Sequence, residues 1–453
     1  MPKTKTVFVC QNCGAESSKW IGRCPSCNEW NTYHEEVIAP ASQGGLVPRS
    51  DLEKRKPQRL DEIKSDEHSR RKSGLAELDR LLGGGIVNGS LILLGGEPGV
   101  GKSTLALQLA LALKNEKILY VSGEESEEQI SFRAKRMKVS NAECYILSET
   151  DLGNILVHSE NLKPALIIID SIQTMSNSLL ESSAGSVSQV RECAAQLLKY
   201  SKQTGIPIFL IGHITKDGTI AGPKVLEHIV DVVLNFEGDN NHVYRILRAS
   251  KNRFGSTSEI GIFEMIETGL REVSNPSELF INRHDEILSG ISVAVTVDGI
   301  RPFLIETQAL VSSAVYGTPQ RSSTGFDIRR LNMLLAVLEK RAGFKLAVKD
   351  VFLNIAGGIK VTDPAIDLSI ISCILSSSLD IPISKSICFS GETGLSGEIR
   401  PVPRVEQRIR EASKMGFEKI YISRYHKSLP ATGQDIEIIK VGKIEHLVRS
   451  LFA

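Results

Sequence analysis

A phosphate-binding loop is the clearest chemical signal in this chain. It consists of eight consecutive residues, followed directly by Thr104: Gly96, Glu97, Pro98, Gly99, Val100, Gly101, Lys102 and Ser103. They match the pattern G-x-x-x-x-G-K-S, follow the apolar run 91–94 and open a helix-like segment, which is the context that this pattern requires. Backbone N–H groups of such a loop wrap the β-phosphate of ATP, and we expect Lys102 to reach the β and γ oxygens.

Two further side chains are suited to the magnesium ion that accompanies ATP. The Ser103 hydroxyl ends the phosphate loop, and Asp170 ends the apolar run LIIID. In ATPases with this loop, a carboxylate at a strand tip holds the ion together with the loop hydroxyl. The sequence therefore predicts a Mg²⁺ site shared by Ser103 and Asp170.

Hydrolysis also needs a group that orients or deprotonates the attacking water. Glu124 lies just past the apolar run 118–122, in the sequence SGEES, and is our prediction for this base. Glu125 is the competing assignment. A solvated carboxylate at a helix start is the alternative without a catalytic role.

Four cysteines are concentrated near the N-terminus: Cys10, Cys13, Cys24 and Cys27. Two C-x2-C pairs separated by ten residues can converge on one tetrahedral ion, and Zn²⁺ is its usual occupant. Two disulfides or four unrelated thiols are the alternative. Because four thiolates leave no open position, we expect a structural metal. Trp20 and Trp30 flank the second pair, and we expect them to supply most of the core of this small module.

A second basic motif lies far along the chain, in the pentapeptide Lys251, Asn252, Arg253, Phe254 and Gly255. Lys251 and Arg253 are two residues apart, so in an extended segment both side chains point the same way. Two cations before a glycine turn suit a finger that reaches the γ-phosphate on a neighbouring chain. An exposed basic loop is the alternative.

The chain that must position these residues has 453 residues, enough for two or three domains. Shifts in composition predict a zinc ribbon at 1–34, a linker at 35–60, an ATPase domain at 61–272 and a further domain at 273–453.

The ATPase region reads as strands alternating with helices. Apolar strands are predicted at 91–94, 118–122, 165–170, 206–212 and 230–236, and a helix at 102–113. Near-continuous apolar strands of this kind indicate an α/β fold with a parallel sheet covered on both faces. Residues 273–453 mix strands (290–297, 387–391 and 419–422) with helices (326–342, 365–377 and 405–415), which indicates an α+β domain.

Composition excludes several classes of protein. With 41% hydrophobic and 24% charged residues, the chain is globular rather than disordered or collagenous. No apolar run approaches the ~20 residues of a membrane span, and the N-terminus lacks a secretory signal, so we expect a cytoplasmic protein without a membrane partner. A net charge of +1 gives no argument for nucleic acid, which has to rest on local patches.

The motifs together carry a resemblance to a known family. The run 73–104 resembles the RecA/DnaB-type ATPase core. With the four-cysteine ribbon and the pentapeptide KNRFG, the chain resembles the bacterial RadA (Sms) DNA-repair family over essentially its whole length.

The resemblance implies a DNA-dependent ATPase, helicase-like and hexameric, that moves on single-stranded DNA and promotes branch migration in homologous recombination. It implies branched DNA and a RecA-type recombinase as partners, with His213 as a polar sensor of the γ-phosphate. It also places segments 176–189 and 215–228, which include Lys216 and Lys224, along a central DNA channel. Ordinary surface loops are the alternative for these segments.

Residues from about 280 onward resemble the Lon protease domain, through GGIKVTDPAIDLSI and FSGETGLSGEIRPVPRVEQRI. Ala365 stands where that pattern has its nucleophilic serine, and Glu406 where it has the lysine base. Alanine offers no nucleophile, so we expect a Lon-like fold without peptidase activity. Five basic residues in and before the predicted helix 405–415 form a candidate duplex-DNA face: Arg400, Arg404, Arg408, Arg410 and Lys414. An ordinary solvated charged helix is the alternative.

Two other functions compete with a DNA motor. An ATPase joined to a Lon-like domain suggests an ATP-dependent protease, against which Ala365 argues directly. A RecA-fold signalling ATPase that does not bind DNA is disfavoured by the ribbon and by the paired cations of KNRFG. DNA-stimulated ATP turnover separates the signalling ATPase from the motor.

Overall fold

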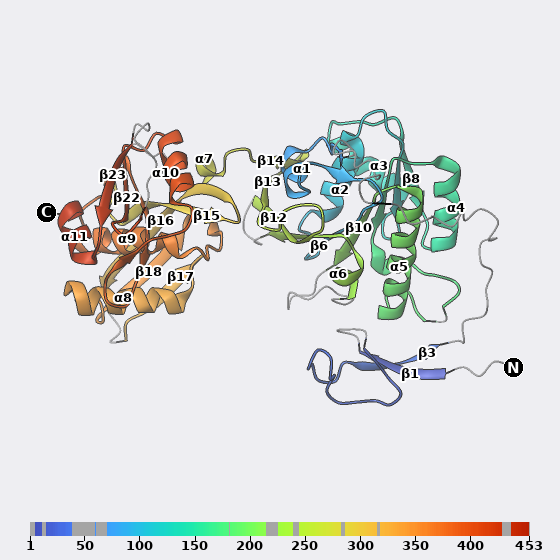
Figure 1. Ribbon diagram of the computed structural model, residues 1–453, viewed down its shortest axis with the longest axis horizontal. Coiled ribbons are helices and arrows are strands. Elements are labelled where there is room, and N and C mark those ends of the chain that lie inside the picture. The colour runs from blue at the N-terminus through green and yellow to red at the C-terminus, as the bar shows by residue number, and fades with distance from the viewer. Residues whose placement is uncertain are drawn as a thin grey trace. The chain divides into compact units, whose positions relative to one another are not determined.

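The computed structural model describes residues 5–10, 15–38, 59, 70–180, 182–213, 225–238, 244–281, 286–314, 318–427 and 436–452. The chain divides into two compact units, one made of residues 1–238 and 245–272 and the other of residues 239–244 and 273–453 (Figure 1). The first unit carries the phosphate loop and the cysteines of the ribbon, and the second carries the Lon-like sequence.

The ribbon is a small antiparallel sheet at the start of the first unit. Its strands are β1 (Lys5–Cys10), β2 (Glu16–Ser17) and β3 (Tyr33–Ile38), in the order β2-β1-β3. Among the described residues of the ribbon, the buried cluster at the cysteines consists of Cys10, Cys24 and Tyr33. So small a core is typical of a module whose stability depends on a metal.

The core of the first unit is a nine-stranded sheet in the order β14-β13-β12-β11-β6-β10-β9-β7-β8. Its bounds are β6 (Leu91–Gly96), β7 (Ile118–Ser122), β8 (Cys144–Ser148), β9 (Leu166–Asp170), β10 (Ile208–His213), β11 (Val232–Gly238), β12 (Tyr244–Asn252), β13 (Ile260–Ile266) and β14 (Gly269–Glu272). The six strands from β11 to β8 run parallel, whereas β12 runs antiparallel to β11. The parallel part of this α/β sheet confirms what the alternation of elements predicts, and the RecA-like fold agrees with what the resemblance implies.

Helices cover this sheet on both faces. They are α1 (Ala76–Leu81), α2 (Lys102–Ala112), α3 (Glu127–Arg136), α4 (Leu152–Leu162), α5 (Val187–Thr204) and α6 (Val225–Ile229). A short pair, β4 (Arg70–Arg71) with β5 (Ile86–Val87), precedes the sheet, and η3 (Ile172–Thr174) follows β9.

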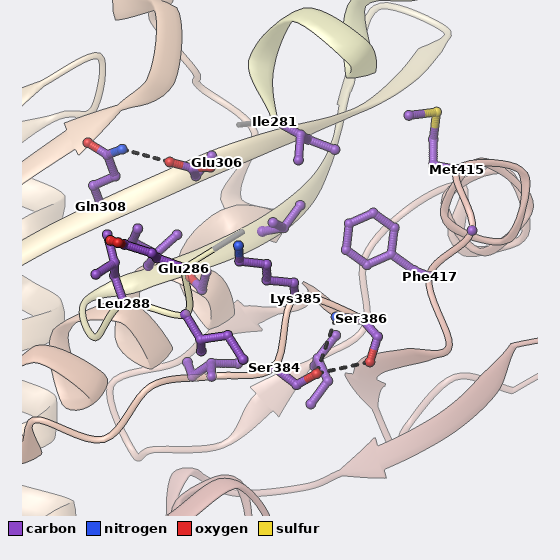
Figure 2. A pocket seen from close by; sticks show the side chains of 17 residues that line it. Ile281, Glu286, Leu288, Glu306, Gln308, Ser384, Lys385, Ser386, Met415 and Phe417 are labelled. Atoms are coloured by element: carbon purple, nitrogen blue, oxygen red, sulfur yellow. Dashed lines mark hydrogen bonds between the residues drawn. The ribbon is translucent and has the colours of Figure 1, made fainter. Parts of the chain in front are cut away.

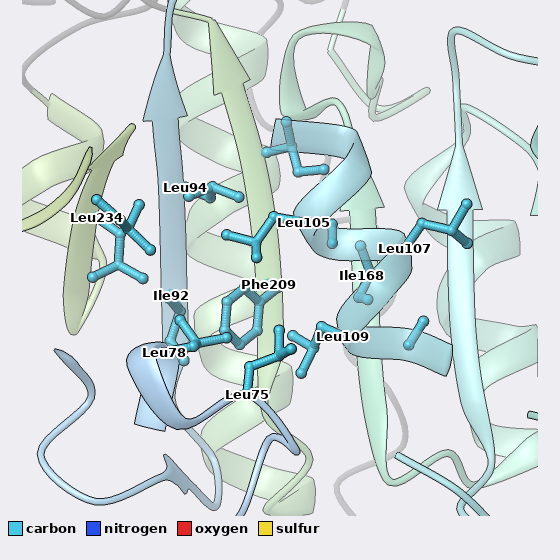
Figure 3. Packing of buried hydrophobic residues seen from close by; sticks show 14 of the residues in the cluster. Leu75, Leu78, Ile92, Leu94, Leu105, Leu107, Leu109, Ile168, Phe209 and Leu234 are labelled. Atoms are coloured by element: carbon cyan, nitrogen blue, oxygen red, sulfur yellow. The ribbon is translucent and has the colours of Figure 1, made fainter. Parts of the chain in front are cut away.

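Strand β6 shows why these strands are apolar throughout. Its alternate residues face opposite sides, so Ile92 and Leu94 pack in the cluster that contains Leu105 of α2 (Figure 3). Leu91 and Leu93 pack in the second cluster, on the side of α5. A strand covered on both faces has no position left for a polar side chain, which is the physical basis of the run LILLGG.

The second unit is an α+β domain built on a seven-stranded sheet in the order β17-β18-β16-β15-β19-β22-β23. Its strands are β15 (Ile291–Asp298), β16 (Arg301–Ser313), β17 (Arg321–Thr324), β18 (Lys349–Ile355), β19 (Ile387–Ser390), β22 (Lys419–Ser423) and β23 (Glu437–Val441), with a small pair β20 (Glu392–Thr393) and β21 (Ile399–Arg400). Its helices are α7 (Pro276–Phe280), α8 (Ile328–Ala342), α9 (Asp367–Leu379), α10 (Val405–Lys414) and α11 (Ile444–Phe452), with the 3-10 turns η4 (Ala356–Gly358) and η5 (Pro364–Ile366).

A pocket of about 720 Å³ lies in this second unit (Figure 2). Apolar side chains such as Ile281, Met415 and Phe417 line it together with Lys385 and Glu306, and Gln308 donates a 2.6 Å hydrogen bond to Glu306. Ala365 does not line it, so this pocket is not the place of the serine in the Lon pattern.

Candidate active site

The phosphate loop connects the end of β6 to the start of α2. Glycine is needed at both ends of this loop. A Cβ at Gly96 would lie 2.6 Å from the carbonyl oxygen of Phe236, and Gly101 has a φ of 111°, which other residues rarely adopt. Between them, residues 97–99 are exposed, so the backbone of the loop is open to a ligand.

Lys102, in the first turn of α2, is only 4% exposed. Its ammonium group donates to the carbonyl oxygens of Gly96 and Glu97, both at 2.8 Å. Burial lowers the pKa of Lys102 to about 8, against the opposing effect of Asp170 and Glu124. The loop thus holds an amine close to where the phosphate oxygens of a nucleotide would lie, and those oxygens would relieve the cost of its burial.

Asp170 is the last residue of β9 and is 4% exposed. Its Oδ2 accepts a 2.6 Å hydrogen bond from the hydroxyl of Tyr120, whose pKa is raised well above its usual value by burial and by Asp170. Its Oδ1 is buried and has no hydrogen-bond partner among the described residues. A buried carboxylate oxygen left over in this way is suited to a cation or its water.

Glu124 brings the ends of three strands together. Its Oε1 accepts hydrogen bonds from the Ser171 hydroxyl at 2.5 Å, just after β9, and from His213 Nε2 at 3.1 Å, at the end of β10. Burial would raise the pKa of Glu124, but these two hydrogen bonds and the charge of Lys102 outweigh burial and lower it. The carboxylate is therefore ionised at neutral pH and lies beside the residue expected to sense the γ-phosphate.

Glu125 points to a different partner. Both of its carboxylate oxygens contact the Arg133 guanidinium of α3, at 3.0 and 2.8 Å. A carboxylate held in a two-point ion pair is poorly placed to accept a proton from water. The geometry therefore favours Glu124 over Glu125 as the base.

Replacing Glu124 with glutamine tests this choice. The amide fills the same space but accepts no proton, so nucleotide binding is expected to persist while turnover falls by about 10²–10⁴-fold. Single-turnover hydrolysis and equilibrium binding of a fluorescent ATP analogue measure the two effects separately. Glu125→Gln is the matched control, and normal turnover in Glu124→Gln with loss in Glu125→Gln would reverse the assignment.

The KNRFG segment lies at the opposite end of the parallel strands from the phosphate loop. Its Asn252 pairs with Val232 at the start of β11, and Val232 pairs with Ile92 near the start of β6, whereas the phosphate loop follows the end of β6. At about 3.3 Å per residue, the four steps from Ile92 to Gly96 put Asn252 roughly 13 Å of strand before the loop, and Lys251, aligned through Val233 with Leu93, lies roughly 10 Å before it. Lys251 and Arg253 therefore do not reach the phosphate loop of their own chain.

Both cations turn toward the same stretch at the end of α6, as their spacing predicts. The Lys251 ammonium donates to the carbonyl oxygens of Glu227 at 2.6 Å and Val230 at 2.7 Å, and burial lowers its pKa. Arg253 contacts Asp231 Oδ1 at 3.2 Å, and its side chain is 55% exposed. Lys251 thus fastens the segment to α6, while much of Arg253 stays open to solvent.

Asp231 is a buried carboxylate that the sequence did not single out. Besides Arg253, its Oδ2 accepts from the Lys202 ammonium at 2.7 Å and from the backbone N–H of Leu91 at 3.1 Å. It therefore ties KNRFG to the first residue of β6. A single Asp before an apolar strand carries no signal that distinguishes this role.

The candidate channel segments are only partly described. In segment 176–189, Gln189 Nε2 donates to the carbonyl oxygens of Asn177 at 3.2 Å and Ser182 at 2.9 Å, which folds this segment back on itself. In segment 215–228, Lys216 and Lys224 lie outside the described residues.

Comparison with known proteins identifies the family. The chain is 48% identical to the DNA repair protein RadA of Bacillus subtilis (strain 168) over 454 residues, which covers 99% of each chain. It is 47% identical to the DNA repair protein RadA of Listeria monocytogenes, covering 98% of this chain and 97% of that one. The chain belongs to the RadA family of DNA repair proteins.

Family models match three parts of this RadA-family chain. An AAA domain matches residues 56–219, a rubredoxin metal binding domain residues 8–35, and the subunit ChlI of Mg-chelatase residues 310–425. The chain is accordingly an ATP hydrolase with a RecA-like core, an N-terminal zinc-ribbon fold and a C-terminal Lon-protease-like domain. No helix in the described part of the chain is long and apolar enough to span a membrane.

The ribbon of this RadA-family chain gathers a metal site. The sulfur atoms of Cys10, Cys24 and Cys27 lie within 4.8 Å of one another, while Cys13 falls outside the described residues. The expected tryptophan core is wrong, because Trp20 is 55% and Trp30 67% exposed. The fold is instead closed around the cysteine sulfurs and Tyr33.

Replacing Cys24 with alanine is expected to remove the metal. Three remaining thiolates close a tetrahedral site poorly, and folding of so small a module depends on the ion. Metal analysis of reduced protein should give about one zinc per wild-type chain and a loss of about tenfold or more in the variant's affinity. Cys144→Ala, outside the ribbon, is the control, and equal zinc in all three proteins would contradict the assignment.

In the Lon-like domain of this RadA-family chain, Ala365 is fully buried in η5 and Glu406 is exposed on α10. The candidate DNA face on α10 needs a correction. Arg408 is 1% exposed, and its Nη1 lies 2.7 Å from Asp363 Oδ2 and 2.8 Å from the carbonyl oxygen of Val295. Arg408 therefore forms a buried ion pair with Asp363 and is not part of a DNA-binding surface. Arg404, Arg410 and Lys414 are exposed.

Proposed function

We propose that this chain is a DNA-dependent ATPase that forms a homohexameric ring, moves along single-stranded DNA and promotes branch migration during homologous recombination in the cytoplasm. The proposal includes branched DNA and a RecA-type recombinase as partners. It is supported by the relatives, which are DNA repair proteins, and by the resemblance to DnaB-type motors.

The observation that carries the ring is the position of KNRFG. Because Lys251 and Arg253 lie at the opposite end of the parallel strands from their own phosphate loop, a role on a nucleotide requires a neighbouring chain. Such head-to-tail contacts are heterologous and close into a ring when the rotation permits. Each nucleotide would then lie between two subunits.

Within that site, the residues of this chain have separate tasks. Lys102 would contact the β and γ oxygens of ATP, and Ser103 and Asp170 would hold Mg²⁺, which neutralises phosphate charge when it is bound. Glu124 would accept the proton of the attacking water, and His213 would report the γ-phosphate to it. Lys251 and Arg253 of the neighbour would add positive charge as the leaving phosphate becomes negative. Zn²⁺ would be held by all four ribbon cysteines.

ATP turnover with and without single-stranded DNA tests the proposal. A motor is expected to hydrolyse ATP at least about tenfold faster when it moves on DNA, since turnover is then coupled to a conformational step. Light scattering of the same sample gives the number of subunits. A rate that single-stranded DNA leaves unchanged would favour the signalling ATPase. Degradation of casein would support the ATP-dependent protease instead, despite the alanine at position 365.

A further inference from the structure

The two tryptophans of the chain lie side by side on the surface of the ribbon. The chain contains no other tryptophan, and Trp20 and Trp30 are 55% and 67% exposed. A Cβ at Gly22 would lie 3.6 Å from Trp20 Cη2 and 4.0 Å from Trp30 Cζ3, so both indoles border the same glycine. Ile21 between them is also exposed.

A cation belongs to this surface and is held in place. The Arg23 guanidinium carbon lies 5.7 Å from the ring centroid of Trp30, and Arg23 Nε donates to the carbonyl oxygen of Asn28 at 3.0 Å. A β-bridge pairs Arg23 with Trp30, and the N–H of Asn31 donates to the carbonyl of Gly22 at 2.7 Å. The surface is therefore preorganised by backbone contacts, and the exposed Lys19 directly precedes Trp20 in the chain.

The size of this surface decides what fits it. A stable protein interface needs about 800 Å² on each partner, far more than two indoles and a guanidinium provide. An unpaired nucleobase needs a single aromatic face, and each stacked base contributes about 1–3 kcal/mol. Arg23 and Lys19 supply donors for the phosphates between successive bases, whereas duplex DNA keeps its bases stacked inside.

We propose that Trp20, Trp30 and Arg23 form a platform on which unpaired bases of single-stranded DNA stack. The proposal takes its substrate class from the proposed function and assigns that substrate a second site, on residues of the ribbon rather than of the ATPase core. Among residues 15–34, Glu16 and Glu29 balance Lys19 and Arg23, so stacking rather than net charge supplies the binding. With two cations on the phosphates, binding at this platform is expected to fall with salt at a slope of about −1.4 in log K against log salt concentration.

Intrinsic fluorescence tests the platform directly, because all tryptophan emission of the full chain comes from it. Titration with oligo(dT) is expected to lower the emission about twofold, since stacked bases quench indole. A duplex of equal length and inorganic polyphosphate, which offer phosphates without free bases, should leave the emission nearly unchanged. Equal quenching by polyphosphate, or constant emission while a labelled oligo(dT) binds, would overturn the proposal.

A variant series separates this proposal from the proposed function. Trp30→Ala is expected to weaken oligo(dT) binding by about 5–100-fold, whereas Trp30→Phe, which keeps an aromatic face, should retain most of it. Phe132→Ala is the matched control, because Phe132 is 69% exposed and also carries an arginine, Arg136, 5.9 Å from its ring centroid. Zinc content of each variant reports that the ribbon is folded.

The possible failures are distinguishable. If the wild-type chain binds no oligo(dT), the proposed function fails together with the platform. If the wild type binds and Trp30→Ala binds equally well with its zinc in place, only the platform is wrong. Quenching by a protein partner in place of oligo(dT) would show that the surface serves protein contacts, and would also overturn the proposal.

Discussion

Replacing Lys102 with alanine is expected to lower the rate of ATP hydrolysis by at least about 10²–10³-fold, the scale on which loss of one preorganised charge acts. Lys102 is the cation of the phosphate loop, and α2 holds its ammonium on the carbonyl oxygens of Gly96 and Glu97. No described neighbour within the loop can replace it. Steady-state phosphate release measures the effect.

The same substitution should leave the protein folded. Burial is the largest cause of the lowered pKa of Lys102, so the folded state bears a cost for this charge that alanine removes. We expect the melting temperature to stay equal or to rise, and the zinc content to remain unchanged. Lys114→Ala, an exposed lysine beyond the end of α2, is the control. Wild-type turnover in Lys102→Ala would place the nucleotide site elsewhere in the chain.

Mixing two inactive variants is expected to restore ATP hydrolysis. Lys251→Ala chains keep the phosphate loop but lose the finger lysine, and Lys102→Ala chains keep the finger but lose the loop lysine. In a mixed ring, some interfaces combine one intact loop with one intact finger. At equal amounts, about a quarter of the interfaces have this combination if subunits assort at random, so partial recovery over either parent is expected.

The reason for this expectation is the geometry of β6. The phosphate loop begins at its last residue, Gly96, while Asp231 ties Arg253 of KNRFG to its first residue, Leu91. Lys251 and Arg253 are held at that end of the strands by contacts with residues 227–231, so a finger that acts on a nucleotide acts on the nucleotide of another chain. Activity of mixtures, with Lys199→Ala as a control for an exposed lysine on α5, is the measurement. If mixed rings form and stay as inactive as both parents, the finger does not act between chains.

Motifs whose chemistry depends on neighbours along the chain were predictable from the sequence. The strand, loop and helix around Lys102 occur in one continuous stretch, and the predicted strand at 118–122 coincides with β7. Several edge and antiparallel strands were missed, among them the thirteen-residue β16, although its antiparallel neighbour β15 was predicted at 290–297. The partly exposed second half of β16 lacks the continuous apolar run that reveals a buried parallel strand.

Contacts between distant residues escaped the sequence. Glu124 and Glu125 are adjacent and chemically identical, and only the positions of Ser171, His213 and Arg133 in space separate them. In the sequence, Arg408 is one of several basic residues that suggest a surface, and only the structure shows that it is paired with Asp363.

Trp20 and Trp30 are the opposite case, because the sequence predicted that they are buried and the structure shows that they are exposed. Tryptophan is large and apolar, so a small module is expected to bury it, yet the convergence of the cysteines leaves no interior for an indole. The sequence by itself determined which chemistry the chain carries, because residue types and local spacing encode a phosphate loop and a cysteine site. Only the tertiary structure decided which side chains face a ligand, which are consumed by buried ion pairs and at which end of the parallel strands KNRFG lies. Those outcomes depend on strand order and packing between residues far apart in the chain.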